Sequence, residues 1–586
     1  MNYRHFKYEG WLYAFAFAIA LAVRFIGLGA MPLTDAEAAP ALQALHLSQS
    51  ANPTLDPHPL YILTTSILFL AFGGGTNFLA RFIPALIGSL LVLAPLLFED
   101  RLKPRPSLIL AFFLALDPGL VAISRQAASP ILAITFLVFT VGFFNKAKPS
   151  HTAVCAALAL LSGPSIWFGI LSLGITLAIA QLFKQRTATE TRQLETNHEA
   201  QETDSETQST QTSSPPAPVL NEAKEFHFPF PTFLFTFILA GSLFFTIPSG
   251  IGAAFASIPA FIEKWTTGST ITQGMALISL PVYQPFALLL AGIALIRGWA
   301  FGYRRVILLS VWLFVSFLLV IFMPARQMAD LAWMLLPLHA IAALELTRHI
   351  TIYPEERREI LGVILLTSFL WAFAWLGLSS LNWLPIGTSE YTLRAAMLFG
   401  SLLLLIVSLI LIAAGWSIRT ASLGGVWGMA LGLGVLTVGS LFGAAGLRGT
   451  SFPELWWQPA IPTQAQLLRE TISQVSETSM GNDYAATVAI MGIESPALEW
   501  TLRENHVEIV HSLDVTSTPD FVITPYELNP ELISAYRGQD FLWRQNPSWQ
   551  LATPADWFRW VTLREMLTTQ ENIILWARSD LFLGSE

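Results

Sequence analysis

The chain has 586 residues, of which 53% are hydrophobic and only 12% are charged, and its mean hydropathy is +0.55. Soluble proteins hold about 25% charged residues, so this composition excludes a soluble globular protein. The net charge of −8 arises in residues 448–586, which contain 8 Arg, no Lys and 18 Asp or Glu. An acidic module without lysine argues against nucleic acid as a partner. The single cysteine, Cys155, excludes a disulfide framework and a cysteine-based metal site.

Long apolar runs recur along the first 450 residues, and each is long enough to cross a bilayer core of roughly 30 Å. The first run ends without a small-residue cleavage site, which indicates a retained span and not a signal peptide. The run at 58–73 is shorter and is closed by three glycines, so we expect it to lie along the membrane interface. We predict thirteen spans, at 9–29, 78–98, 107–124, 129–145, 151–162, 164–183, 229–249, 278–296, 305–323, 329–347, 360–379, 391–414 and 421–446.

The loops between these spans differ in positive charge. With the N-terminus in the cytoplasm, eighteen Lys and Arg residues fall inside and six fall outside, as the positive-inside rule demands. The rival topology has fourteen spans, with 58–73 crossing and the N-terminus outside. It would place Asp35 in the cytoplasm. We expect a multi-pass protein of the plasma membrane whose C-terminal domain is extracytoplasmic.

These patterns divide the chain into four parts. Residues 1–183 form an N-terminal membrane part that includes the first outer loop, and residues 229–447 form a C-terminal membrane part. Residues 184–228 are rich in Thr, Glu, Gln and Ser and predict a disordered cytoplasmic linker. Residues 448–586 alternate helical and strand patterns, which predicts a small soluble α/β domain with a mostly parallel sheet. Its helices are expected at 463–480 and 495–505, and its strands at 485–492, 507–513, 520–527 and 572–582.

The first outer loop, "PLTDAEAAPALQAL", holds two carboxylates, Asp35 and Glu37. Thr34 and Glu37 match a capping box, in which each side chain satisfies a free N–H of a helix N-terminus. Residues two apart on a helix point about 200° apart, so Asp35 and Glu37 cannot face the same point. If Glu37 completes the cap, Asp35 is free for chemistry. A purely structural acidic turn remains the alternative.

Arginine predominates on the outer side, and its planar guanidinium binds phosphate oxygens through two parallel hydrogen bonds. Carboxylates and arginines at a lipid–water boundary suit a substrate with a phosphate head, an apolar tail and a group to transfer. The alternative is that Arg24, Arg81 and Arg394 only extend from span ends to the interface. Asp117-Pro118 likewise has a structural interpretation as a helix stop.

Several segments, in this order, resemble the GT-C membrane glycosyltransferases, and most closely the family 39 branch of protein O-mannosyltransferases and lipid A aminoarabinose transferases. They cover residues 10–350. The chain departs from the family pattern where Ala36 separates the acidic pair, where His58-Pro59 replaces a doubled proline, and where Ser129-Pro130 replaces an acidic residue. The segments are "RFIGLGAMPLTDAEAAPALQAL", the stretch from "DPHPLYILTTSILFLAFGGG" to "LARFIPAL", "ALDPGLVAISRQAASP" and "MPARQMADLAWMLLPLHAIAALEL".

This resemblance implies transfer of a sugar from a polyprenyl-phosphate-linked donor to a protein, lipid or glycan acceptor on the outer face, with inversion at the anomeric carbon. The implied catalytic carboxylates are Asp35 or Glu37 as general base, and Asp117. The implied ligands of the donor phosphate are Arg326, Arg125, His58 and Arg81. No cofactor is certain, metal ligands cannot be assigned, and dependence on a divalent cation stays open.

Two other classes of function fit the composition. A transporter would show helices broken by Gly or Pro at matching positions of two halves, and the breaks in this chain lack such symmetry. A non-catalytic membrane scaffold that presents the acidic domain is consistent with the departures from the family pattern.

Overall fold

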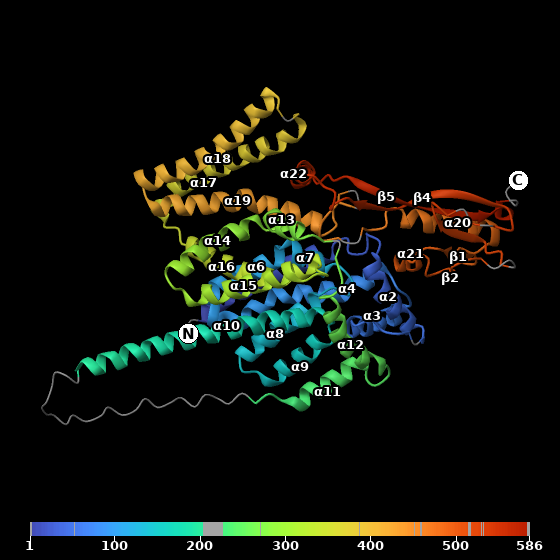
Figure 1. Ribbon diagram of the computed structural model, residues 1–586, viewed down its shortest axis with the longest axis horizontal. Helices are drawn as coiled ribbons and strands as arrows, with labels where there is room; N and C mark the ends of the chain where they lie inside the picture. The colour runs from blue at the N-terminus through green and yellow to red at the C-terminus, as the bar shows by residue number, and fades with distance from the viewer. Residues whose placement is uncertain are drawn as a thin grey trace.

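The protein is described by a computed structural model that covers residues 3–51, 53–202, 227–269, 271–385, 387–449, 452–457, 460–513, 517–528, 530 and 532–582. Helices form a large bundle, and a smaller domain built on a five-stranded sheet lies at one end of it (Figure 1). The predicted class, a polytopic helical membrane protein with a C-terminal sheet domain, is confirmed in this outline.

The bundle contains the helices that precede residue 448, several of them separated only by proline-containing breaks. They are α1 (Tyr3–Phe25), α2 (Asp35–Ser48), α3 (Pro59–Phe72), α4 (Asn77–Leu90), α5 (Glu99–Leu102), α6 (Pro104–Leu116), α7 (Pro118–Ser124), α8 (Ile131–Asn145), α9 (Pro149–Leu160), α10 (Ser165–Glu202), α11 (Phe230–Gly241), α12 (Ser249–Glu263), α13 (Gln273–Tyr283), α14 (Pro285–Ala300), α15 (Arg304–Phe322), α16 (Ala332–Leu346), α17 (Arg357–Ser380), α18 (Ser389–Gly415) and α19 (Ile418–Ala444). The 3₁₀ helices η1 (Leu91–Phe98) and η2 (Met328–Leu331) extend α4 and precede α16.

Within the described residues, seven helices are long and apolar enough to cross a membrane, or nine if each bent pair is counted as one span. Five further apolar helices are shorter, and α3, α8 and α9 are among them. The predicted number of thirteen spans is therefore not confirmed. The segment predicted as a span at 229–249 consists of α11 and a loop that leads into α12, a helix that the sequence analysis did not anticipate.

Two predicted spans are bent helix pairs. The axis turns by 58° between α6 and α7 and by 94° between α13 and α14. Proline is the first residue after each break, at Pro118 and Pro285, and its ring restricts the preceding residue to non-helical conformations. The interpretation of Asp117-Pro118 as a helix stop is confirmed.

The segment predicted to be a disordered linker is partly helical. Helix α10 continues from the bundle to Glu202, past the predicted start of the linker at 184. Its Glu, Gln, Lys and Arg residues are good helix formers, and a helix already nucleated in a span extends at little cost. Residues 203–226, the remainder of the linker apart from 227 and 228, lie outside the described residues.

The first loop and the C-terminal domain lie at the same end of the bundle, because Asp35 contacts Arg544 of that domain. The loop after α15 joins this end, since Ala325 N–H donates to the carbonyl of Lys264 (3.0 Å), which lies near His58. Helix α10 extends beyond the opposite end (Figure 1). The rival topology, with Asp35 and the domain on opposite sides of the membrane, is inconsistent with these contacts.

The C-terminal sheet has the strand order β2-β1-β3-β5-β4. Strand β1 pairs parallel with β2 and β3, whereas β5 pairs antiparallel with β3 and β4, so the prediction of a mostly parallel sheet is wrong for half of the pairings. The unpredicted β4 is a partly exposed edge strand with many polar residues. The elements are α20 (Ala465–Met480), β1 (Thr487–Met491), α21 (Pro496–Thr501), β2 (His506–Val510), β3 (Phe521–Pro525), β4 (Tyr536–Pro547), α22 (Pro554–Leu563) and β5 (Thr568–Arg578).

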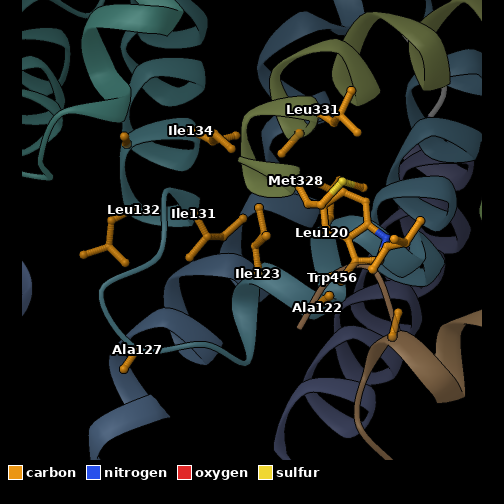
Figure 2. Packing of buried hydrophobic residues seen from close by; sticks show 14 of the residues in the cluster. Leu120, Ala122, Ile123, Ala127, Ile131, Leu132, Ile134, Met328, Leu331 and Trp456 are labelled. Atoms are coloured by element: carbon orange, nitrogen blue, oxygen red, sulfur yellow. The ribbon is translucent and has the colours of Figure 1, made fainter. Parts of the chain in front are cut away.

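The hydrophobic core is continuous from the bundle into the domain. Trp456, in the segment that leads to the domain, is 4% exposed and lies among Leu120, Ala122 and Met328 (Figure 2). A Cβ on Gly119 would approach its ring to 2.5 Å, so a residue without a side chain is needed where the indole packs on α7. Most tryptophans of the domain are buried, so their main use is core packing.

Candidate functional site at the first loop

Asp35, the first residue of α2, joins the bundle to the C-terminal domain. Its Oδ1 accepts hydrogen bonds from Ser495 Oγ (2.7 Å) and from the N–H of Ala497 (3.0 Å), and its Oδ2 accepts one from Arg544. Ser495 and Ala497 form the N-terminus of α21, where free N–H groups favour a negative charge. The Asp35 side chain remains 24% exposed, so it is accessible to an acceptor.

Glu37 is buried within the bundle and fully hydrogen-bonded. Arg81 binds both of its oxygens through Nε and Nη2, at 2.8 Å each. Thr34 donates from its N–H (3.1 Å), as the predicted capping box requires, and also from its Oγ (3.2 Å), and the N–H of Ala127 adds a fifth bond (3.0 Å). With a side chain 4% exposed and five donors bound, Glu37 has no solvent-facing surface to offer an acceptor hydroxyl. The alternative that Glu37 is the base stays a prediction, and the geometry favours Asp35.

Arg81 has no N–H left for a donor phosphate. Besides its two bonds to Glu37, its Nη1 donates to the carbonyls of Leu28 and Met31, and its Nη2 donates to that of Pro32. All five guanidinium donors are therefore used to hold the turn before α2. These contacts fix the backbone that presents Asp35, and the predicted role of Arg81 in phosphate binding stays a prediction that they do not support.

Asp117 caps α7 inside the membrane bundle. Its Oδ1 accepts the N–H of Leu120 (2.7 Å), and its Oδ2 lies 3.2 Å from Gln284 Nε2 and 3.3 Å from His339 Nε2. Asp117 is 1% exposed and Gln284 precedes Pro285, so this cluster links the two helix bends. These contacts give Asp117 a structural role at the helix bend, and its predicted catalytic role stays a prediction that they do not support.

Two other predicted phosphate ligands bind backbone carbonyls at helix ends. Arg125 Nη1 donates to the carbonyls of residues 23, 24 and 26 at the end of α1. Arg326 donates to Ile271 (3.0 Å), Ile321 (3.2 Å) and Val320 (3.4 Å), the last two in α15. Cations stabilise helix C-termini, which explains both positions. Among the described residues, three of the five N–H groups of Arg326 have partners, and Arg326 is only half-buried, whereas Arg125 is 3% exposed.

Lys264 adds positive charge at the same end of the bundle as Arg326, and His58 adds a neutral imidazole. Burial, reinforced by the positive charge of Lys264 and opposed by Asp56, lowers the pKa of the His58 imidazole from 6.5 to about 4. Lys264 lies 3.6 Å from Asp330 and is 19% exposed. The sequence analysis did not select Lys264. The available signal was that Lys264 is the only lysine among the six basic residues predicted outside.

A cavity of about 930 Å³ lies at the same end, between the first-loop helices and the C-terminal domain. Its lining includes Gln49, Gly73–Thr76, Tyr484 and Arg503. Arg503 is fixed by the carbonyls of Gly75 (2.8 Å) and Trp500 (2.8 Å), and burial lowers the pKa of its guanidinium. The volume is in the range of about 300–1,000 Å³ that small-molecule sites occupy. Within the described residues, no group of three His, Cys, Asp or Glu side chains is arranged to hold a metal ion.

Comparisons with known proteins identify the fold of this architecture. No family model matches the sequence, and no curated protein matches it. Solved structures do match: the chain has the GT-C fold of membrane glycosyltransferases, as the sequence resemblance implied.

The match extends over nearly the whole of both chains. ArnT from Cupriavidus metallidurans bound to undecaprenyl phosphate superposes with a TM-score of 0.54 and 13% identity, over 98% of this chain and 99% of that chain. The apo state of that ArnT gives a TM-score of 0.51, again with 13% identity, over 98% of each chain. At this identity the likeness shows the fold and not the activity.

Proposed function

We propose that the protein is an integral membrane glycosyltransferase that moves a sugar from a polyprenyl-phosphate carrier to an acceptor hydroxyl on the outer face of the membrane. The observation that carries this proposal is the GT-C fold over the whole chain, shared with an ArnT bound to undecaprenyl phosphate. The geometry adds that Asp35 is the only one of the three candidate carboxylates with an exposed side chain.

In the proposed reaction, the Asp35 carboxylate accepts the proton of the acceptor hydroxyl, as a general base does. The acceptor oxygen attacks the anomeric carbon from the face opposite the phosphate, so a new C–O bond forms with inversion. The bond from the anomeric carbon to the phosphate oxygen breaks, and polyprenyl phosphate leaves with the electron pair. Negative charge grows on that phosphate, and nearby cations lower the barrier by stabilising it.

The cations available for this role are Arg326, two of whose N–H groups have no partner among the described residues, and Lys264. The imidazole of His58 is neutral above about pH 4 and donates at most one hydrogen bond to the phosphate. Ser495 and Arg544 hold the base in one orientation. No step is assigned to a metal ion, because the described residues offer no ligand set.

A second candidate, a non-catalytic scaffold that presents the C-terminal domain, is favoured by two specific observations. Asp35 is already ion-paired with Arg544. The His58 region also contacts α2 away from Asp35, since Gln43 accepts the N–H of Asp56. Eight residues of helix separate Gln43 from Asp35, or about 12 Å at 1.5 Å per residue. A sugar that contacts both Asp35 and the His58 region would have to span this distance of about 12 Å.

Turnover by the purified protein distinguishes the two functions. Protein in liposomes is incubated with undecaprenyl-phosphate-linked sugars labelled in the sugar, together with envelope lipids and glycans as acceptors. Release of undecaprenyl phosphate with label transfer is expected. Asp35→Asn should reduce the rate by roughly 10²–10⁴-fold, the usual worth of a general base. The control Glu494→Gln removes an exposed carboxylate next to Ser495 and should keep full activity. No transfer from any donor would favour the scaffold.

The plasma-membrane location and the outer placement of the C-terminal domain belong to the same proposal. In a Cys155→Ser background, a cysteine at the exposed Ser517 should react with a membrane-impermeant maleimide added to intact cells. A cysteine at the exposed Arg305, at the other end of α15 from the domain, should react only after lysis. The reverse result would invert the topology.

A further inference from the structure

A second large cavity lies at the end of the bundle opposite the C-terminal domain. Its volume is about 710 Å³, and it opens among α5, α6, α8, α10, α15 and α16. Helix α15 fixes its position: the 19 residues from Arg304 to Phe322 span about 28 Å, and the loop after Phe322 contacts Lys264 at the domain end. Arg304, which lines the cavity, is therefore at the far end.

The depth of this cavity is apolar. Leu114, Leu137, Trp333 and Leu336 line it; Trp333 is 0% exposed, and its indole N–H donates to Ser165 Oγ (3.0 Å), which fixes the ring. Apolar cavities stay free of water, and a cavity open to a bilayer is filled by hydrocarbon instead. The volume lies within the range of about 300–1,000 Å³ for ligand sites.

The mouth of the cavity is positively charged. Arg304 and Arg305 line it, both are exposed, and neither has a hydrogen bond or an acidic partner among the described residues. Arg101 lies beside them and donates to Asn145 Oδ1. The acidic residue of the mouth, Asp100, is neutralised by Lys146. The mouth thus presents unpaired guanidinium groups above an apolar interior.

We propose that this cavity binds an anionic phospholipid, with one acyl chain between α6, α15 and α16 and the phosphate against Arg304 and Arg305. Guanidinium groups bind phosphate oxygens in pairs of hydrogen bonds, and basic pockets between membrane helices at the inner side select anionic head groups. Charge complementarity decides against a zwitterionic lipid, whose head group brings its own cation to the mouth. The site is separate from the first loop and does not depend on glycosyl transfer.

The test titrates delipidated protein in detergent with dioleoyl phosphatidylglycerol or dioleoyl phosphatidylcholine and counts bound lipid by native mass spectrometry. Phosphatidylglycerol should bind more tightly. The double variant Arg304→Gln and Arg305→Gln should weaken its binding about 25-fold, at about fivefold per basic residue, and leave phosphatidylcholine binding unchanged. Arg357→Gln with Arg358→Gln, an exposed basic pair that does not line this cavity, is the matched control and should not alter binding.

A second variant tests the interior. Val141, on α8, lines the cavity and is 38% exposed, so Val141→Trp adds bulk inside without removing a polar contact. It should abolish tight binding of phosphatidylglycerol while the protein still elutes as a single folded species. Equal affinity for the two lipids in the wild type, equal losses in the two arginine pairs, or unchanged binding in a folded Val141→Trp would each overturn the proposal.

Discussion

Asp35 and Glu37 are two residues apart on one helix, yet their surroundings differ in almost every physical respect. Glu37 is 4% exposed and is held by five donors from its own membrane part. Asp35 is 24% exposed and is held by Ser495, Ala497 and Arg544 from another domain, more than 450 residues away in sequence. A helix places residues two apart on opposite faces, so one carboxylate enters the core while the other meets the domain.

This difference shows how a buried charge is tolerated and how a reactive one can be kept. A carboxylate inside a membrane bundle is stable only when every lone pair has a donor, and that saturation removes its capacity to accept another proton. A carboxylate at a domain boundary is held by fewer groups and keeps contact with solvent. The region around Glu37 is therefore structural, and the region around Asp35 is where chemistry remains available.

The largest expected effect comes from a substitution that disrupts the ion pair between Glu37 and Arg81. Glu37→Gln leaves the buried Arg81 charge without a counter-ion, and breaking a buried ion pair costs about 3–5 kcal/mol. We expect loss of most folded protein, measured as the monodisperse fraction in size-exclusion chromatography and as the melting temperature. Glu565→Gln, which breaks the exposed Arg559–Glu565 pair, is the control and should cost at most about 1 kcal/mol.

The double variant Glu37→Gln with Arg81→Met removes both charges and should recover part of that loss, because no unpaired ion remains. If Glu37→Gln were as stable as Glu565→Gln, the two carboxylates would not differ in the way that the structure indicates.

The comparison also shows what the sequence could establish. The Thr34–Glu37 capping box and the helix stop at Asp117-Pro118 were predicted because each depends on residues within one turn of helix. The partners of the two carboxylates could not be predicted, since Arg81 is 44 residues from Glu37 and Arg544 is 509 residues from Asp35. The sequence around an arginine does not show whether its side chain binds backbone carbonyls or phosphate.

Two features of the fold were missed for related reasons. Strand β4 is an exposed edge strand whose residues do not alternate cleanly between apolar and polar, so no period-two pattern marks it. Helices α8 and α9 are apolar but have only 15 and 12 residues, and composition alone does not separate a short buried helix from a span. Family resemblance supplied the GT-C fold, which local patterns could not supply.

A pH test sharpens the comparison with a third ionisable group of the same loop. His58 is half-buried without a hydrogen bond to its ring among the described residues, and its pKa is lowered from 6.5 to about 4. Between pH 6.5 and about pH 4, the His58 imidazole is therefore protonated in the unfolded chain and neutral in the folded chain. Its contribution to stability is complete above pH 6.5 and is lost as the pH falls toward 4.

The slope that one such proton can produce is at most about 1.4 kcal/mol per pH unit. His58→Gln should flatten the fall in melting temperature between pH 6.5 and 4.5, whereas His511→Gln, at an exposed position, should not. If melting temperature fell with pH in parallel for the wild type and His58→Gln, the imidazole would be protonated in the folded protein over this range. The burial of His58 would then not have lowered its pKa.

The smallest expected effect on stability concerns the Asp35 region. Arg544→Gln removes the ionic contact with Asp35 but leaves the bonds from Ser495 and Ala497, so the free energy of unfolding should fall by no more than about 1 kcal/mol, as for other partly exposed pairs. Hydrogen exchange should nevertheless rise at the N-termini of α2 and α21, because this contact joins the two domains. Arg559→Gln, in the exposed pair on α22, should leave both segments unchanged.

Under the proposed function, turnover should fall because the base is less well oriented, and Arg544→Lys should restore part of it through the retained charge. If Arg544→Gln increased turnover while exchange rose, the contact would be a restraint that must open for catalysis. If it destabilised the protein as severely as Glu37→Gln, Asp35 would be structural after all, and the contrast between the two carboxylates would no longer hold.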